Sequence, residues 1–205
     1  MDWVLKGISQ ETDHKHLNLF TFHYAVVKEG KETDYPYFVA SRRSKGKLTA
    51  LTHDFARPDG VLIAAIKEGK DPSLLIIEEF RPAIGSHIIA FPAGLMDEED
   101  TDVTETAIRE AEEEAGVRLE DIRLLCPPSP TSAGLSDENV AVVEGKVSAL
   151  SETHLEMFED INARFVSFKE LRNLLEDKTV VIALNVRLCM LYLLERYERY
   201  CDKAN

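Results

Sequence analysis

The sequence is poor in cysteine, in long apolar runs and in basic stretches, and each shortage argues against a class of protein. Its three cysteines, Cys126, Cys189 and Cys201, are odd in number and lack metal-ligand spacing. We therefore expect reduced thiols in a cytoplasmic protein. No uncharged run approaches the roughly 20 residues that span a bilayer, and the first residues do not resemble a signal peptide. The formal net charge of −13 argues against nucleic acid as a partner, and no membrane partner is expected either.

The histidines show no paired helical spacing, and no Gly-rich P-loop or Ser-His-Asp pattern is present. His87, which lies near the acidic stretch described below, is the one weak exception among residues that otherwise suit structural roles. With 205 residues and 44% hydrophobic content, the chain can bury a substantial core.

Hydrophobic patterning divides the chain into an N-terminal arm, residues 1–52, and a main domain, residues 53–205. In the arm, aromatic and β-branched residues predict strands at 19–27 and 35–40, joined by a turn at 28–31. In the main domain we expect strands at 60–66, 74–80, 88–91, 122–125, 139–147 and 164–168, and helices at 103–115, 169–176 and 182–200. A loop is expected at 127–134, and a loop or a short helix at 151–160. This order implies an α/β (α+β) fold, an α/β/α sandwich with a mixed sheet and an antiparallel β arm.

An acidic stretch, Gly94 to Val117, carries ten acids against a single base, Arg109. Its second half is predicted to be a helix that begins at the N-cap Asp102, with Glu105 in a capping-box position, and ends at Gly116. Helical periodicity places the apolar residues on one narrow stripe, which consists of Ala107, Ile108, Ala111 and Ala115.

Glu110, Glu113 and Glu114 are expected on a different arc of this helix, because residues three and four apart are neighbours. Three carboxylates on one face repel one another unless a cation offsets their charge. Mg²⁺ suits such oxygen ligands while keeping positions open for water or phosphate. The alternative interpretation of this face is a solvated acidic surface.

The stretch from Arg109 to Val117, read as REAEEEAGV, resembles the R-E-U-x-E-E-x-G-U core of the Nudix hydrolase box, where U is a bulky apolar residue. Pro92-Ala93-Gly94 resembles the loop that opens this box. Fourteen residues separate Gly94 from Arg109, one more than in the family. The counterpart of the family's first glutamate is therefore open among Asp100, Thr101, Glu98 and Glu99.

Three further segments resemble the ADP-ribose pyrophosphatases of this family: Glu78–Pro82, Ser136–Glu138 and Glu156–Ile161. The resemblance implies a homodimer that exchanges its N-terminal strands, with Tyr37 stacking on adenine. Ordinary strand packing is the alternative role for Tyr37. A departure from the subfamily is Ala90, where a glutamate is usual.

The implied activity is Mg²⁺-dependent hydrolysis of a diphosphate, with Mn²⁺ as a possible substitute. ADP-ribose, cleaved to AMP and ribose 5-phosphate, is the first expected substrate, and a nucleotide sugar or another nucleoside diphosphate derivative is the alternative. A catalytically silent domain that senses a nucleotide is the alternative from another class.

The resemblance also implies roles for individual residues. Metal ligands are expected from Glu110, Glu113, Glu114 and the Ala93 carbonyl, while Arg109 orients the glutamates and Gly94 and Gly116 belong to the motif. Arg42, in a basic segment that otherwise suits a solvated loop, and Arg81 are expected to clamp the diphosphate. A loop carboxylate takes a proton from the attacking water, with Glu159 as first choice and Glu156 as second.

Overall fold

The computed structural model describes residues 1–97 and 99–204, and the chain divides into two compact units. The first unit comprises residues 1–59 together with 128–140, and the second comprises 60–127 together with 141–205. Side chains are described up to residue 199, so Cys201 falls outside this part, while Cys126 and Cys189 are free thiols. Among the described residues, no helix is both long and apolar enough to cross a membrane.

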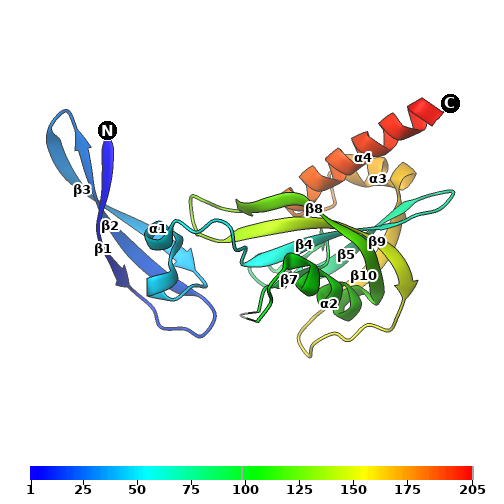
Figure 1. The fold of residues 1–205 in the computed structure, drawn as a ribbon, viewed down its shortest axis with the longest axis horizontal. Coiled ribbons are helices and arrows are strands. Elements are labelled where there is room, and N and C mark those ends of the chain that lie inside the picture. The colour runs from blue at the N-terminus through cyan, green and yellow to red at the C-terminus, as the bar shows by residue number, and fades with distance from the viewer. Residues whose placement is uncertain (98, 205) are drawn as a thin grey trace. The chain divides into compact units, whose positions relative to one another are not determined.

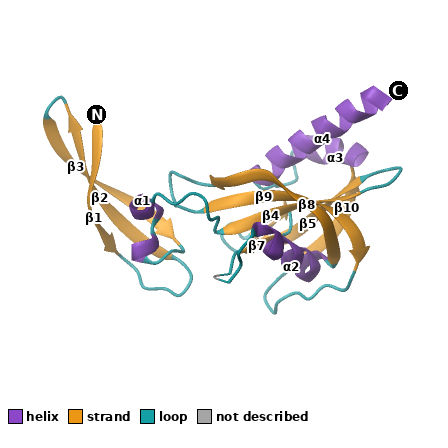
Figure 2. Ribbon diagram, in the orientation of Figure 1, coloured by secondary structure: helices purple, strands orange, loops and turns teal. Residues whose placement is uncertain are grey.

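The first unit is built on a three-stranded antiparallel sheet in the order β1-β2-β3 (Figure 2). Its elements are β1 (Asp2–Gln10), β2 (Asn18–Lys28), β3 (Lys31–Ser41), a 3₁₀ turn at Lys45–Lys47 and α1 (Thr49–Thr52). The two expected strands and their turn are confirmed, because Lys28 pairs with Lys31 around Glu29 and Gly30, both of which have positive φ. The core of this sheet is formed by Phe20, Phe22, Val39 and Leu48.

A distant segment completes this unit. Asp59 donates its backbone N–H to Asn139 O and accepts from the Asn139 N–H through its carboxylate, at 2.8 and 2.9 Å. The Asp137 carboxylate likewise accepts from the Thr49 N–H at 3.0 Å. Residues 128–140 therefore fold with the N-terminal 59 residues, although they lie far along the chain.

The second unit contains a seven-stranded sheet with helices (Figure 1). The sheet runs in the order β10-β5-β4-β9-β8, with β6 paired to β5 and β7 paired to β4. The strands are β4 (Gly60–Lys67), β5 (Ser73–Arg81), β6 (Ser86–Ala90), β7 (Ala93–Leu95), β8 (Val117–Pro130), β9 (Asn139–Leu150) and β10 (Ile161–Ser167). The helices are α2 (Val103–Ala115), α3 (Phe168–Glu176) and α4 (Leu184–Ala204). The α/β class and the β arm are confirmed.

Burial on both faces of the sheet explains why the sequence of β4 is an uninterrupted apolar run. Its residues Val61, Ile63 and Ala65 pack against Ala107 and Ala111 of α2 in one core cluster. Ile66 points to the other side and lines a cavity with residues of α4. A strand covered by helices on both faces has no polar face, which is why the alternation is hidden in its sequence.

Three local expectations were wrong. Ile108 is 42% exposed, so the buried stripe of α2 is narrower than predicted. The Glu105 carboxylate accepts from the backbone N–H and hydroxyl of Thr101 rather than from Asp102, so the N-cap forms without a capping box. Residues 127–130, expected in a loop, belong to the end of β8, although three of these four residues are prolines.

Candidate active site

Two glycines allow the acidic helix to meet its surroundings. β7 pairs with β4 through Gly94 opposite Val61, and a Cβ on Gly94 would lie 2.0 Å from the carboxyl group of Glu110. Gly116 ends α2 with φ +60, and a Cβ there would lie 2.5 Å from Ser151 O. Gly116 requires glycine, because its backbone is left-handed and approaches another backbone oxygen closely, whereas a Cβ at Gly94 would displace the Glu110 side chain.

Glu114 is the most deeply placed carboxylate of the helix. It is 8% exposed, and its Oε2 accepts the backbone N–H of Ala93 at 3.0 Å. Burial raises the pKa of Glu114 to about 8, against the opposing effect of the Ala93 hydrogen bond, and the charges of Glu110, Glu79 and Glu159 raise it further. Ionising this buried carboxylate is therefore unfavourable unless a cation lies beside it.

Glu110 and Glu113 are held by Arg109. The guanidinium Nη1 lies 2.6 Å from Glu110 Oε1 and 3.4 Å from Glu113 Oε2. The expected i,i+4 pair of Arg109 with Glu113 is thus present, but the shorter contact is with the adjacent Glu110. Burial raises the pKa of Glu110 even though Arg109 acts in the opposite direction. Arg109 offsets only part of the negative charge.

The lengthened loop before the helix is braced by Asp100. Its Oδ2 accepts from the Thr106 hydroxyl at 2.7 Å and from the Asp97 backbone N–H at 2.9 Å. Among the four alternatives for the family's first glutamate, Asp100 therefore makes structural contacts to α2. Thr101 also contacts α2, because its backbone N–H donates to the Glu105 carboxylate at 3.1 Å, and Glu98 lies outside the described residues.

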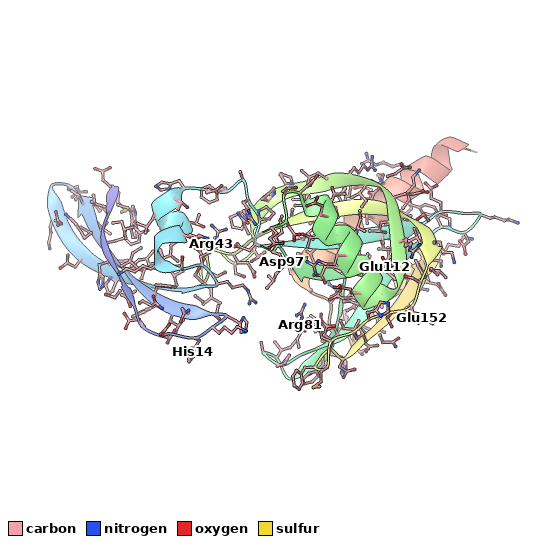
Figure 3. All side chains as sticks on the ribbon, turned by 60° about the horizontal axis from the view of Figure 1, so that its bottom comes forward. His14, Arg43, Arg81, Asp97, Glu112 and Glu152 are labelled. Carbon is pink, nitrogen blue, oxygen red and sulfur yellow. The ribbon has the colours of Figure 1, made fainter. Side chains whose placement is uncertain are left out.

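Glu79 is a member of the acidic cluster that the sequence analysis did not select. Its side chain is 14% exposed and lies 2.9 Å from Arg81, and burial raises its pKa. Its position follows from the packing of β5. Leu75 of β5 packs in the same cluster as Ala107 and Ala111, so period-two alternation places Glu79 and Arg81 on the face of β5 that α2 covers. Figure 3 labels Arg81 at the end of this strand.

The 151–160 loop, between β9 and β10, carries both candidate bases. The charge of Glu159 raises the pKa of Glu79, Glu110 and Glu114, so its carboxylate is within electrostatic range of all three. Glu159 Oε2 also accepts the backbone N–H of Glu156 at 2.7 Å. Glu156 contributes to none of these three shifts, which makes Glu159 the better placed of the two.

The donor set suits a hard divalent cation, although the side chains do not form a finished metal cage. Among the described residues, no three His, Cys, Asp or Glu side chains converge as a metal site. Arg109 instead holds Glu110 and Glu113. Carboxylate and carbonyl oxygens around a buried Glu114 with a raised pKa are nevertheless ligands of the type that Mg²⁺ and Mn²⁺ take. The residues therefore fit a divalent ion by chemistry and by charge.

Arg42 and Tyr37, the other two candidate substrate-binding residues, belong to the first unit. Arg42 is partly exposed and its Nε lies 3.7 Å from Glu138. Tyr37 lines a cavity of about 220 Å³ together with Phe22, Tyr24 and Phe55, and its hydroxyl donates to Gly134 O at 2.8 Å. The acidic cluster and Arg81 belong to the second unit.

Arg43, not singled out by sequence, has a structural role. It donates to both carboxylate oxygens of Asp59 at 2.9 Å and to the Thr49 hydroxyl at 2.7 Å. Its guanidinium is therefore committed within the first unit. The neighbouring Arg42 is the more accessible cation of the basic segment.

A larger cavity, of about 550 Å³, lies on the α4 side of the second unit. It is lined by Ile66, Glu144, Phe168, Leu193, Arg196 and Tyr197, among others, and none of the glutamates of α2 reaches it. Its ionic side chains already pair with one another, as Glu144 does with Arg123 and Arg196 at 2.8 and 2.6 Å. We place the candidate site at the acidic cluster, where the carboxylates outnumber the single Arg109 that pairs with them, rather than at the larger cavity.

The chain is similar in sequence to known proteins. Residues 56–184 match the family model for the NUDIX domain. The chain is 34% identical over 112 residues to an ADP-ribose pyrophosphatase of Saccharomyces cerevisiae, covering 54% of this chain and 44% of that protein. It is 28% identical over 153 residues to a chloroplastic Nudix hydrolase 14 of Arabidopsis thaliana, covering 64% and 50%. The chain thus spans about half the length of these relatives.

A solved structure shares the fold. The crystal structure of an ADP compounds hydrolase superposes with a TM-score of 0.69 at 16% identity, covering 97% of this chain and 95% of that one.

Proposed function

Since the chain belongs to the NUDIX domain family, as its motif indicated, we propose that it hydrolyses the diphosphate bond of a nucleoside diphosphate derivative with the help of Mg²⁺. The observation that carries this proposal is the buried Glu114 beside Ala93, with a pKa raised to about 8, in a cluster with Glu110 and Glu113. Ionising such a buried carboxyl group costs free energy when no metal is bound, and a bound cation would offset that cost.

In this proposal the metal ligands are Glu110, Glu113, Glu114 and the Ala93 carbonyl oxygen. When bound, divalent ions neutralise the charge of the diphosphate and acidify a water molecule. Arg109 orients the glutamates through its contacts to Glu110 and Glu113.

The remaining residues bind the substrate or accept a proton. Arg81 donates to diphosphate oxygens in place of its contact with Glu79. Arg42, in the basic segment, donates to them in place of its contact with Glu138. Glu159 accepts the proton of the attacking water, with Glu156 as the alternative. Tyr37 offers an aromatic face for adenine beside its cavity.

ADP-ribose is the proposed substrate, with AMP and ribose 5-phosphate as products. The similarity to the yeast ADP-ribose pyrophosphatase supports this choice. A nucleotide sugar would use the same glutamates with different contacts to its sugar. A silent sensing domain would have no need of three clustered carboxylates, one of them buried, and the cost of burying Glu114 argues for a catalytic role.

The proposed assembly is a homodimer formed through the N-terminal arm. Leu19 and Phe38 are exposed on the face of the arm sheet opposite its core, and a second copy would cover this surface. Size-exclusion chromatography with light scattering of a Phe38→Asp variant tests this, and a dimer that is unaffected in that variant contradicts the use of this surface. A cytoplasmic location stays a prediction.

The experiment that tests the function measures hydrolysis of ADP-ribose, two nucleotide sugars, NADH and diadenosine polyphosphates with Mg²⁺. Glu114→Gln is run alongside, and Glu112→Gln is the matched control. Glu112, which Figure 3 labels, lies on the same helix. Its carboxylate pairs with Arg118 at 3.3 Å. We expect AMP from ADP-ribose, loss of about 100-fold or more in Glu114→Gln, and near-normal turnover in Glu112→Gln.

Other outcomes assign the protein differently. Preferential cleavage of a nucleotide sugar selects the alternative substrate class. Tight binding of a nucleotide without Mg²⁺-dependent turnover selects the sensing domain. Full activity of Glu114→Gln at saturating Mg²⁺ rejects the proposed metal site.

A further inference from the structure

The 151–160 loop is tied at its beginning to the end of the acidic helix. The Ser151 N–H donates to Gly116 O at 2.7 Å, and the His154 N–H donates to Glu113 O at 2.8 Å. Both contacts are made by the backbone. The start of the loop is therefore fixed by main-chain geometry and is insensitive to the side chains there.

The end of the loop is held by one main-chain bond and one side-chain bond, both at Asp160. Asp160 O accepts the Phe80 N–H at 3.1 Å, and Asp160 Oδ2 lies 2.9 Å from His87 Nε2. Because an ionised carboxylate can only accept, the hydrogen of this bond is on His87 Nε2. His87 is itself held in place, since it pairs with Phe80 across β5 and β6 and their rings meet edge to face at 5.3 Å.

The middle of the loop has little packing to hold it. Met157 and Phe158 are 89% and 94% exposed, and the Glu159 carboxylate bonds to the Glu156 N–H of the same turn. Glu159 directly precedes Asp160. The position of the Glu159 carboxylate at the cluster therefore depends on the anchor at the next residue.

We propose that His87 is a positioning residue, which holds Asp160 and thereby keeps the Glu159 carboxylate beside Glu110 and Glu114. The inference rests on the proposed function in giving Glu159 the role of proton acceptor. The two anchoring side chains are 47% and 74% exposed, so their bond adds little to global stability. Its effect is local, on the fraction of time that the loop is in place.

The test combines kinetics with hydrogen–deuterium exchange of full-length protein. The variants are His87→Ala, Asp160→Ala, the double variant and His87→Gln, whose amide N–H replaces the imidazole donor. His154→Ala is the control, because it removes an imidazole from the same loop and leaves the His87–Asp160 pair intact.

We expect His87→Ala to speed exchange of residues 155–160 and of the Phe80 amide, and to lower kcat for ADP-ribose about three- to tenfold with less change in KM. Asp160→Ala and the double variant should match it, because the two side chains act as one unit. His87→Gln should restore most of the slow exchange and most of kcat, and His154→Ala should resemble the wild type.

Unchanged exchange in both single variants overturns the inference, as does a kcat that stays at the wild-type value while exchange rises. Effects that add in the double variant also overturn it. If the wild type itself cleaves no substrate of the panel, the proposed function fails, and the exchange rates alone then decide whether His87 holds the loop.

Discussion

Replacing Glu114 by Gln should stabilise the metal-free protein at neutral and basic pH. The pKa of Glu114 is raised from 4.5 to about 8 in the folded chain. Because the folded state holds this proton more tightly than the unfolded state, the stabilising contribution is complete below about pH 4.5 and is lost as the pH rises through about 8. Gln cannot ionise and keeps an oxygen that accepts the Ala93 N–H.

The magnitude follows from the two pKa values. Between about pH 5 and pH 8 the wild type loses about 3.5 kcal/mol through this group, a loss that Glu114→Gln avoids. For a chain of this size the difference is roughly 7 to 14 °C in Tm. It should shrink when Mg²⁺ is added, since binding at about 100 times Kd stabilises the wild type alone by about 2.7 kcal/mol.

Denaturant unfolding in EDTA, followed by circular dichroism at several pH values, measures the free energy of unfolding of both proteins. Comparison at each pH cancels the titration of all other groups. Glu112→Gln is the control, and its difference from the wild type should not grow with pH. A difference between wild type and Glu114→Gln that stays constant from about pH 5 to pH 8 would refute the uncompensated burial of this carboxylate.

Three further perturbations test other parts of the structure. Gly94→Ala should lower kcat about 100-fold, because its Cβ would lie 2.0 Å from the Glu110 carboxyl group, and normal turnover would show that this packing is not required. Arg43→Ala should lower the free energy of unfolding by about 2 to 3 kcal/mol, since it leaves Asp59 without two of its donors, and unchanged denaturant midpoints would contradict that role. Arg81→Ala should raise KM about tenfold in steady-state assays with a smaller change in kcat, whereas an unchanged KM would remove it from the substrate site.

The acidic helix was predictable because its determinants are local. Asp102 caps it, Gly116 ends it in a left-handed conformation, and Ala107 and Ala111 bury its inner stripe. The clustering of Glu110 with Glu113 and Glu114 follows from helical spacing alone. The exposure of Ile108 does not, since it depends on how far the sheet extends beneath the helix.

Contacts between distant segments were not predictable from single-sequence patterns. Glu79 lies on another strand, and its approach to Glu114 depends on sheet order. The bond between His87 and Asp160 joins residues 73 positions apart. The assignment of residues 128–140 to the N-terminal unit likewise depends on pairing across the chain, which local periodicity does not report.

The chain passes between its two compact units three times, at residues 59–60, 127–128 and 140–141. During synthesis the N-terminal sheet therefore emerges well before residues 128–140, which complete its unit. Asn139, which bonds to Asp59, is made 80 residues later. At roughly 5 to 20 residues per second the delay is about 4 to 16 seconds, during which exposed strand edges must avoid other chains. Removing the first 59 residues, or moving them to another protein, would separate Asp59 from Asn139. The first 59 residues are therefore not a separable module.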